Sequence, residues 1–231
     1  MPRASEIKEI FRAIARNYDL NNTILSAGMH HGWRRKLLAW AEPHPGLRAL
    51  DLCTGTGDIA CLLARGGATT IGVDFSPAML DQARRKLERK KLADRVSLLQ
   101  ADGLQLPFPD QTFDLVTIAF GVRNFEKPEA GIKEAARVLK KEGSLLVLEL
   151  GKPSGRWTRS LYWFYSHYLM PWLAAPLTRD RHAYRYLHES LWRFPCGAEF
   201  EAMLQHCGLK TVRWKSLTLG TAYLYHARIR G

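Results

Sequence analysis

The chain has 231 residues, enough to bury a full hydrophobic core, and its apolar and charged fractions are ordinary for a globular protein. No apolar run reaches the length of a membrane span and the N-terminus has no apolar signal-peptide core, so we expect a cytoplasmic protein. The four cysteines form no CxxC pair and the eight histidines no HExxH, so no metal site is predicted.

The net charge of +12 is unevenly distributed along the chain. Residues 51–150 carry 14 basic and 14 acidic side chains, whereas residues 1–50 carry 8 and 4 and residues 151–231 carry 12 and 4. The excess of positive charge therefore belongs to the two flanks. Such flanks suit a nucleic-acid partner, an anionic membrane surface, or a basic surface without a special partner.

The first predicted elements lie before the strands. Apolar residues at helical spacing predict a helix around residues 7–14. Residues 18–33 are polar and contain glycine, which indicates a loop region. Residues 34–41 predict a short helix that ends at a turn containing proline and glycine.

Strands and helices then alternate. Strands are predicted at residues 47–53, 69–74, 96–102, 113–120 and 144–150, and helices at 57–66, 78–91 and 128–140, with a turn at 141–143. Ser76 and Pro77 supply an N-cap and a first-turn proline. This order predicts a doubly wound α/β fold with a mostly parallel sheet. Residues 208–231 predict two strands joined at 218–221, an antiparallel pair at the sheet edge.

A glycine loop joins the first strand to its helix. Gly55 and Gly57 begin a G-x-G-x-x-A pattern, and Asp74 follows Gly55 by 19 residues at the end of the second strand. The pattern alone fits either a dinucleotide or S-adenosylmethionine. Asp51 and Asp58 flank the loop, where carboxylates oppose a pyrophosphate but favour an ammonium and a sulfonium. We therefore expect S-adenosylmethionine rather than NAD.

Two later loops offer further contacts to such a cofactor. Asp74 can accept hydrogen bonds from both ribose hydroxyls, and Phe75 beside it can border the adenine. Asp102 can accept a hydrogen bond from the adenine amino group, and Gly103 lets the backbone approach closely. An aspartate that only starts a turn is the alternative for Asp102.

These stretches resemble the ubiquinone/menaquinone C-methyltransferases. "LDLCTGTGD" and "GVDFSPAML" carry part of the resemblance, and "FGVRN" with the leader "YDLNN…S.G.H..WR" is the more specific part. The resemblance runs over nearly the whole chain and implies a class I methyltransferase domain, Rossmann-like, with N-terminal helices and a helical lid. It divides the chain into a helical substrate cap (1–45), a cofactor-binding core (46–152), a lid insertion (153–200), and a C-terminal helix with edge strands (201–231).

The resemblance also implies functional residues. The family's cofactor contacts fall on Thr56, Asp74, Asp102 and Gly103, and family members often have serine where this chain has Ala119, which leaves only backbone groups there. Substrate contacts are implied at His30, Trp33, Tyr165 and Tyr186.

Arg123 and Asn124 leave the fourth predicted strand where ligands of a doubly wound sheet bind. The implied substrate is a demethylmenaquinol, whose ring must lose a phenolic proton to become nucleophilic. Arg123 can stabilise the resulting oxyanion and Asn124 can orient the oxygen. Arginine is a poor base, so water, or Tyr18, His30 or His31, would relay the proton. The alternative for Arg123 is a pair with the surface acid Glu126.

Residues 155–179 are rich in aromatic side chains. Trp157, Leu161, Phe164 and Tyr168 share one helical face, which suits a lid helix packed on the core or an apolar mouth for an isoprenoid tail at the bilayer interface. The expected partners are an isoprenoid quinol, the anionic inner face of the cytoplasmic membrane, and a second copy in a homodimer.

We thus expect C-methylation of demethylmenaquinol to menaquinol. The alternatives are the ubiquinone precursor 2-polyprenyl-6-methoxy-1,4-benzoquinol and another phenolic or lipid acceptor. An RNA-binding protein or RNA methyltransferase is a rival, but the aromatic cluster is more apolar than a base-stacking surface and nothing resembles an RNA-binding module, so no nucleic-acid partner is expected.

Overall fold

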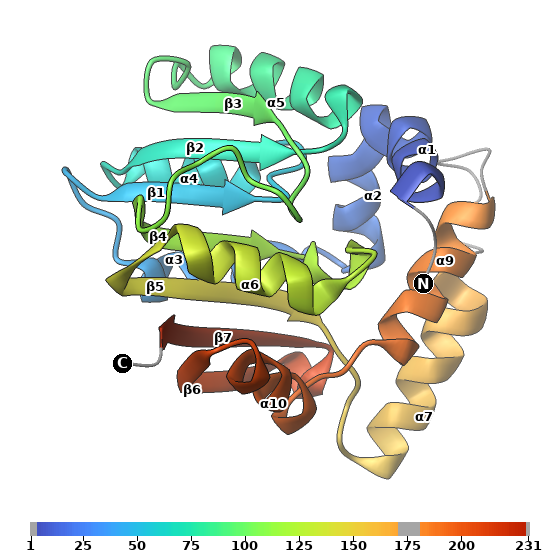
Figure 1. Cartoon of the computed structure of the whole chain (residues 1–231). Coiled ribbons are helices and arrows are strands. Elements are labelled where there is room, and N and C mark those ends of the chain that lie inside the picture. The colour runs from blue at the N-terminus through green and yellow to red at the C-terminus, as the bar shows by residue number, and fades with distance from the viewer. Residues whose placement is uncertain (1–3, 171–180, 230–231) are drawn as a thin grey trace.

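A seven-stranded sheet forms the centre of the protein. The computed structural model describes residues 4–170 and 181–229, and its strand order is β3-β2-β1-β4-β5-β7-β6 (Figure 1). Five strands are parallel: β1 (Arg48–Leu52), β2 (Thr69–Asp74), β3 (Val96–Gln100), β4 (Phe113–Ala119) and β5 (Leu139–Leu150). β7 (Ala222–Ile229) runs antiparallel to both β5 and β6 (Leu209–Leu217). The predicted mostly parallel sheet with an antiparallel edge pair is confirmed.

Helices cover both faces of the sheet. α6 (Pro128–Val138) and α10 (Ala198–His206) lie in front in Figure 1, and α3 (Met29–Ala41) and α4 (Asp58–Arg65) lie behind, with α5 (Pro77–Arg89) beside α4. Side chains along a strand alternate between the two cores. Leu115, Leu146 and Leu148 join the α3–α4 side, whereas Val116 and Val147 join the α6–α10 side.

The N-terminal region departs from the sequence prediction. Residues 18–33 are not a loop region but contain α2 (Tyr18–Leu25) and the start of α3, preceded by α1 (Ala4–Ile14) and the 3-10 turn η1 (Ala15–Asn17). Gly28, with φ of 75°, lets the chain turn between α2 and α3. The helices form despite their polar sequence because α1 and α2 pack at the carboxyl ends of the strands and α3 packs on one face of the sheet, and tertiary packing outweighs local propensity.

The junction between α6 and β5 also differs from the prediction. Residues 141–143 are not a turn, because β5 already begins at Leu139, which pairs with Phe113. The next pair joins Leu115 to Ser144, so the intervening residues bulge from β5. A Cβ at Gly143 would lie 2.9 Å from the Asp114 carbonyl oxygen, which explains why the bulge needs glycine.

The predicted cap of α5 is only partly correct. Pro77 begins the helix as expected. Ser76 precedes it with extended backbone, but its side chain makes no cap hydrogen bond and its Oγ is buried without a partner.

The lid region stands beyond the carboxyl ends of the parallel strands. It consists of α7 (Arg156–Phe164), the π-helix η3 (Tyr165–Leu169) and α9 (Arg181–Arg193), which lie next to one another, and α9 also contacts α1 (Figure 1). The part of the predicted aromatic segment from residue 171 to 179 lies outside the described residues. No helix within the described ranges has both the length and the apolar character needed to cross a membrane.

Candidate active site

A cavity of about 310 Å³ opens beyond the ends of β1, β2 and β4, under α1 and α2. Its wall combines apolar side chains from the N-terminal helices with polar groups from the loops that follow the strands. It brings together eight residues that the sequence analysis singled out, namely Tyr18, Gly55, Asp74, Phe75, Asp102, Gly103, Ala119 and Asn124.

Asp74 holds the glycine loop in place at the end of β2. Its Oδ2 accepts a hydrogen bond of 2.8 Å from the Gly55 amide, and its Oδ1 accepts one of 2.9 Å from the Ser76 amide. Burial raises the pKa of the carboxyl group above its ordinary value, and these amide hydrogen bonds oppose the shift. The carboxylate also borders the cavity, so its unused lone pairs face the ligand space.

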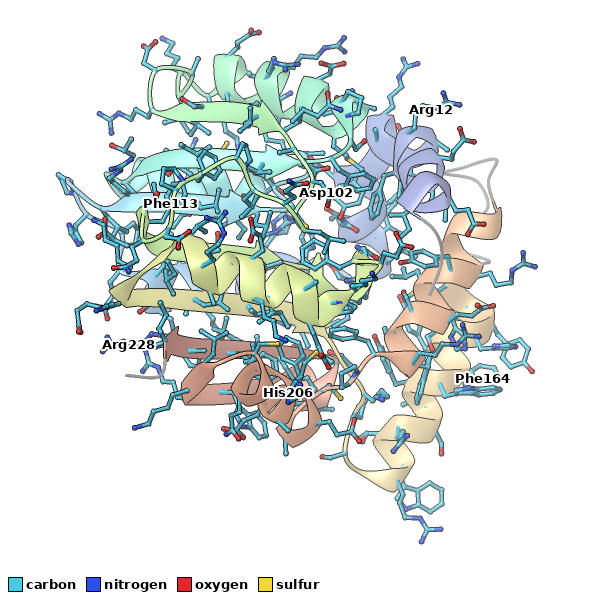
Figure 2. All side chains as sticks on the ribbon, in the orientation of Figure 1. Arg12, Asp102, Phe113, Phe164, His206 and Arg228 are labelled. Atoms are coloured by element: carbon cyan, nitrogen blue, oxygen red, sulfur yellow. The ribbon has the colours of Figure 1, made fainter. Side chains whose placement is uncertain are left out.

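Asp102 and Gly103 form the wall beyond β3. Asp102 does start a turn, because its Oδ1 accepts a hydrogen bond of 2.9 Å from the Leu104 amide, and it also lines the cavity, on the side facing the N-terminal helices (Figure 2). A Cβ at Gly103 would lie 2.7 Å from the Phe125 ring. Phe75 meets Phe11 edge to face at 6.4 Å, which places an aromatic wall between the core and α1.

Asp51 and Gly57 do not line the cavity. Asp51 is 1% exposed and accepts hydrogen bonds from Thr54 Oγ1 (2.6 Å), Thr117 Oγ1 (2.8 Å) and the Ala60 amide (3.2 Å). Burial raises the pKa of Asp51 to about 6, although these hydrogen bonds lower it. Asp51 therefore fixes β1 against the start of α4, and its side chain is turned to these partners and not to the cavity.

Thr56, an expected cofactor contact, does not line the cavity, and its side chain binds other protein groups. Its hydroxyl donates a hydrogen bond of 2.6 Å to Asp19 Oδ1 and accepts one of 2.9 Å from Lys86 Nζ. Lys86 Nζ also lies 2.6 Å from both Asp19 and Asp58, and Arg34 lies 2.6 Å from Asp58. These five side chains form an ionic network that joins α2 and α3 to the glycine loop.

The network also changes the charge argument for the cofactor. Burial alone would raise the pKa of Asp58, but the charges of Arg34 and Lys86 lower it below its ordinary value. The Asp58 carboxylate is thus ionised and neutralised by two cations, so it does not repel a phosphate as the sequence analysis expected. The choice of cofactor has to rest on other observations.

A smaller cavity of about 90 Å³ adjoins the first, and Tyr18 and Phe120 line both. Besides Tyr18, four residues of the sequence analysis lie in its wall, namely His30, Trp33, Arg123 and Tyr165. Tyr165 Oη donates a hydrogen bond of 2.6 Å to the Leu25 carbonyl, which ties the lid to α2. Tyr186 lines neither cavity, but its hydroxyl donates a hydrogen bond of 2.8 Å to Asn124 Oδ1.

Arg123 forms a buried ion pair with Glu149, not the pair with Glu126 that was the alternative. The guanidinium Nη1 contacts Glu149 Oε1, and the two side chains are 8% and 3% exposed. Burial alone would lower the pKa of Arg123, but the charge of Glu149 raises it above its ordinary value. Arg123 Nε is buried and has no hydrogen-bond partner among the residues that the structure describes. Glu149 was missed, although it is the one acid in the apolar run "SLLVLEL".

Phe120 is a second residue that the sequence did not reveal. Its φ of 59° is unfavourable for a side chain of this size. The conformation is held by its carbonyl oxygen, which accepts hydrogen bonds from Arg123 Nη1 (3.0 Å) and Asn124 Nδ2 (3.2 Å). Arg123 and Asn124 therefore fix the residue that separates the two cavities.

The larger cavity suits S-adenosylmethionine. Asp74 and Asp102 offer acceptors for hydroxyl and amino hydrogens, and Gly55 and Gly103 leave room for close approach. A doubly wound sheet with its cavity over the first glycine loop is shared by dinucleotide-binding proteins and class I methyltransferases. The strand order, with β7 inserted antiparallel beside β5, agrees with the class I methyltransferases.

Comparison with known proteins gives the particular family. Residues 2–229 match the model of the ubiE/COQ5 methyltransferase family. A protein of Stenotrophomonas maltophilia named ubiquinone/menaquinone biosynthesis C-methyltransferase UbiE is 39% identical over 95% of this chain and 88% of its own length. A demethylmenaquinone methyltransferase of Bacteroides fragilis is 35% identical over 97% and 93%. The crystal structure of a SAM-dependent methyltransferase from Aquifex aeolicus superposes with a TM-score of 0.60 at 18% identity, over 85% of this chain and 89% of that one.

The chain belongs to the ubiE/COQ5 methyltransferase family. It is a methyltransferase, and its methyl donor is S-adenosylmethionine, as the sequence analysis predicted.

Proposed function

We propose that the protein C-methylates the ring of demethylmenaquinol to give menaquinol, as a demethylmenaquinone methyltransferase. The names of its relatives support a quinone acceptor, and one of them specifies demethylmenaquinone. The nearest alternative is C-methylation of the ubiquinone precursor 2-polyprenyl-6-methoxy-1,4-benzoquinol, because the name of the Stenotrophomonas relative covers both pathways.

The observation that carries the proposal is the meeting of the two cavities at Tyr18 and Phe120. When bound, S-adenosylmethionine supplies a methyl group on a positively charged sulfur. We assign the larger cavity to S-adenosylmethionine and the smaller cavity to the acceptor ring. The wall of the smaller cavity is mostly aromatic and aliphatic, which suits such a ring. Holding both partners at one shared boundary favours transfer through proximity and orientation.

Arg123 is the residue of the acceptor cavity best suited to a phenolate. Its side chain borders that cavity, and its guanidinium keeps a positive charge there. That charge stabilises a hydroxyl oxygen of the ring that gains negative charge. Asn124 borders the other cavity, where it positions Phe120.

Tyr18 stands between the two ligands as a neutral phenol. Burial raises its pKa above the ordinary value, despite a hydrogen bond to Asn22 and the nearby charge of Arg123. A phenol that stays protonated at physiological pH can donate a hydrogen bond but does not remove a proton. Tyr18 is therefore assigned to orientation and not to base catalysis.

The α7 face, defined as Trp157, Leu161, Phe164 and Tyr168, is proposed to rest on an anionic bilayer. These side chains are 91%, 71%, 50% and 54% exposed, and Phe164 points away from the sheet (Figure 2). Arg156 and Arg159 are exposed on the same helix, which supports attraction to acidic lipids. Tyr162 and Tyr165 of the same segment line the acceptor cavity, so an isoprenoid tail can leave along it.

Vesicle sedimentation tests the α7 face. Binding to anionic vesicles should fall as salt is added, because surface charges are screened. Replacing Trp157 and Phe164 together by serine should weaken binding at least tenfold, whereas Trp214→Ser, at an exposed tryptophan of β6, should not. Equal binding of all three proteins, or equal binding to neutral vesicles, would argue against this surface.

The function itself is tested with purified protein, labelled S-adenosylmethionine and a panel of reduced acceptors. The panel contains a demethylmenaquinol, the ubiquinone precursor and an unrelated phenol. Preferred methylation of the demethylmenaquinol is expected. Preference for the benzoquinol would replace the proposed substrate by the alternative, and transfer only to the phenol would reject a quinone substrate.

A further inference from the structure

His30 occupies a central position in the acceptor cavity. It lies in the first turn of α3, is 3% exposed, and lines the cavity together with Arg123 and Tyr165. The ring of its neighbour His31 is tilted by 39° against it with ring centroids 3.9 Å apart, but His31 is exposed and is not part of either cavity wall.

The hydrogen bonds around Ser26 determine which nitrogen of His30 carries hydrogen. Ser26 Oγ has a single hydrogen, and it lies 2.6 Å from the Asn22 carbonyl oxygen, which can only accept. The contact of 2.7 Å between Ser26 Oγ and His30 Nδ1 must then use a hydrogen on Nδ1. The His30 backbone amide also donates toward the same oxygen, at 3.4 Å, which agrees with Oγ as the acceptor.

A neutral imidazole with hydrogen on Nδ1 has a free lone pair on Nε2. Burial lowers the pKa of His30 to about 4, with help from the charges of Arg34 and His31, so the ring is neutral at physiological pH. Within the described part of the chain, Nε2 has no hydrogen-bond partner, yet it is not among the fully buried polar atoms. The lone pair is therefore open to the cavity.

We propose that His30 is a catalytic residue whose Nε2 accepts the proton of the acceptor's ring hydroxyl during methyl transfer. This role rests on the proposed function. Arg123 borders the same cavity and stabilises the oxygen that loses the proton.

The proposed step is balanced in atoms and charge. The ring carbon bonds to the methyl carbon as the bond from that carbon to sulfur breaks, and the hydroxyl proton passes to Nε2. The hydrogen of the methylated ring carbon then leaves to water while His30 returns its proton to the oxygen. The quinol and the neutral imidazole are restored, and one proton is released for each methyl group transferred.

The charges that face His30 come from four elements. Asp19 lies on α2, Arg34 and His31 on α3, and Asp58 on α4, and Arg123 of η2 (Val122–Asn124) borders the same cavity. The cations and burial outweigh the two acids, which keeps Nε2 unprotonated before each turnover. Ser26 acts as a positioning residue, because it holds the Nδ1–H form.

The first test needs no catalysis. Nitrogen-15 NMR of the full chain should show His30 with hydrogen on Nδ1 and a bare Nε2 at about pH 7, and 1,4-dihydroxynaphthalene should shift the Nε2 signal selectively. Hydrogen on Nε2, or no shift at a concentration of the naphthalenediol that saturates the protein, would overturn the proposal.

The second test is single-turnover methyl transfer with His30→Gln, beside His31→Gln as the matched control. Glutamine can accept a hydrogen bond but not a proton, so a loss of about 100-fold is expected near pH 7, within the range for general bases. The loss should shrink as pH rises toward about 10, where phenols ionise without help. The Ser26→Ala variant should lose less of the methyl-transfer rate, about tenfold, because both neutral tautomers of His30 become populated.

The outcomes separate this role from the proposed function. If the wild-type protein is active and His30→Gln does not lower the rate of methyl transfer, the role of His30 is overturned but the proposed function stands. The same conclusion holds if His30→Gln lowers the rate by the same factor at every pH. If the wild-type protein methylates no quinol at all, the proposed function fails and this role fails with it, whatever tautomer the NMR spectrum shows.

Discussion

Replacing the Arg123–Glu149 pair one residue at a time separates its structural role from its role in methyl transfer. Both side chains are almost fully buried, and the Glu149 carboxylate also accepts hydrogen bonds from the Leu150 amide (2.9 Å) and the Arg123 amide (3.4 Å). Glu149→Leu would leave the guanidinium buried beside only the Phe120 carbonyl. Breaking a buried pair in this way costs about 3–5 kcal/mol.

The double variant Arg123→Met/Glu149→Leu should recover most of that loss. A buried pair replaced by apolar side chains of similar volume is often neutral or stabilising, and here the unpartnered Arg123 Nε–H disappears as well. We expect the free energy of unfolding of the double variant to return to within about 1.5 kcal/mol of wild type. The coupling energy between the two sites would then be at least about 1.5 kcal/mol, because Glu149→Leu alone costs about 3 kcal/mol or more, and this lies within the range for contacting residues.

Urea denaturation monitored by circular dichroism gives these energies. Arg84→Met is the matched control, because Arg84 pairs with Asp81 at the surface and its loss should cost less than about 1 kcal/mol. Single-turnover methyl transfer is measured on the same proteins. The double variant should be stable yet slowed by about 10²–10³, the range for loss of one oxyanion donor.

Two results would refute the reasoning. Strictly additive losses in the double variant would mean that the two side chains are not coupled in the folded protein. A stable double variant with normal turnover would mean that Arg123 only holds the backbone of Phe120 and η2.

Three further predictions follow from the cofactor side of the molecule. Asp74→Ala should weaken S-adenosylmethionine binding by about 1.5–3 kcal/mol in calorimetry, since hydrogen bonds to a charged group are lost; unchanged affinity in a folded variant would contradict the assignment. Lys86→Met should lower the free energy of unfolding by about 2 kcal/mol, less than for a fully buried pair because Asp19 is 48% exposed, and a cost below 0.5 kcal/mol would be inconsistent with the network. Burial raises the pKa of Asp51 from 3.8 to about 6, so the protonated native state is favoured and this stabilisation is lost as pH rises from about 4 to about 6. Relative to the Asp51→Asn variant, the free energy of unfolding of the wild type should fall by at most about 3 kcal/mol between these two pH values. Parallel profiles of unfolding free energy against pH for the two proteins would show that Asp51 does not titrate there.

The sheet could be predicted from the sequence because its signals are local. Each parallel strand is a short apolar run bounded by turn residues, and alternation along the run assigns side chains to the two cores. The antiparallel edge was visible from the two strands around residues 218–221. The failure at residues 141–143 has a local cause, since Lys-Glu-Gly favours a turn and a bulge equally and only pairing with β4 decides between them.

The partners of the site residues could not be predicted, because register decides them. Ala119 pairs with Leu148, which brings the ends of β4 and β5 together and so sets Arg123 beside Glu149, 26 residues later in the chain. The left-handed backbone of Phe120 likewise depends on hydrogen bonds from two side chains that follow it. A sequence pattern can place Arg123 at the carboxyl ends of the parallel strands, but it cannot identify Glu149 as the acid with which Arg123 pairs.

Residues 18–33, predicted as a loop region but folded as α2 and the start of α3, show why this difference matters for the site. Tyr18 borders both cavities, and the adjacent Asp19 binds Thr56 and Lys86, so one turn of α2 is joined to the glycine loop and to the acceptor wall together. Read as a loop, residues 18–33 offer a set of independent contacts. As two packed helices they form one wall, because α2 contacts α3 and the ionic network joins both to the glycine loop. The network around Lys86 therefore holds α2, which borders both cavities through Tyr18, against the loop that follows β1.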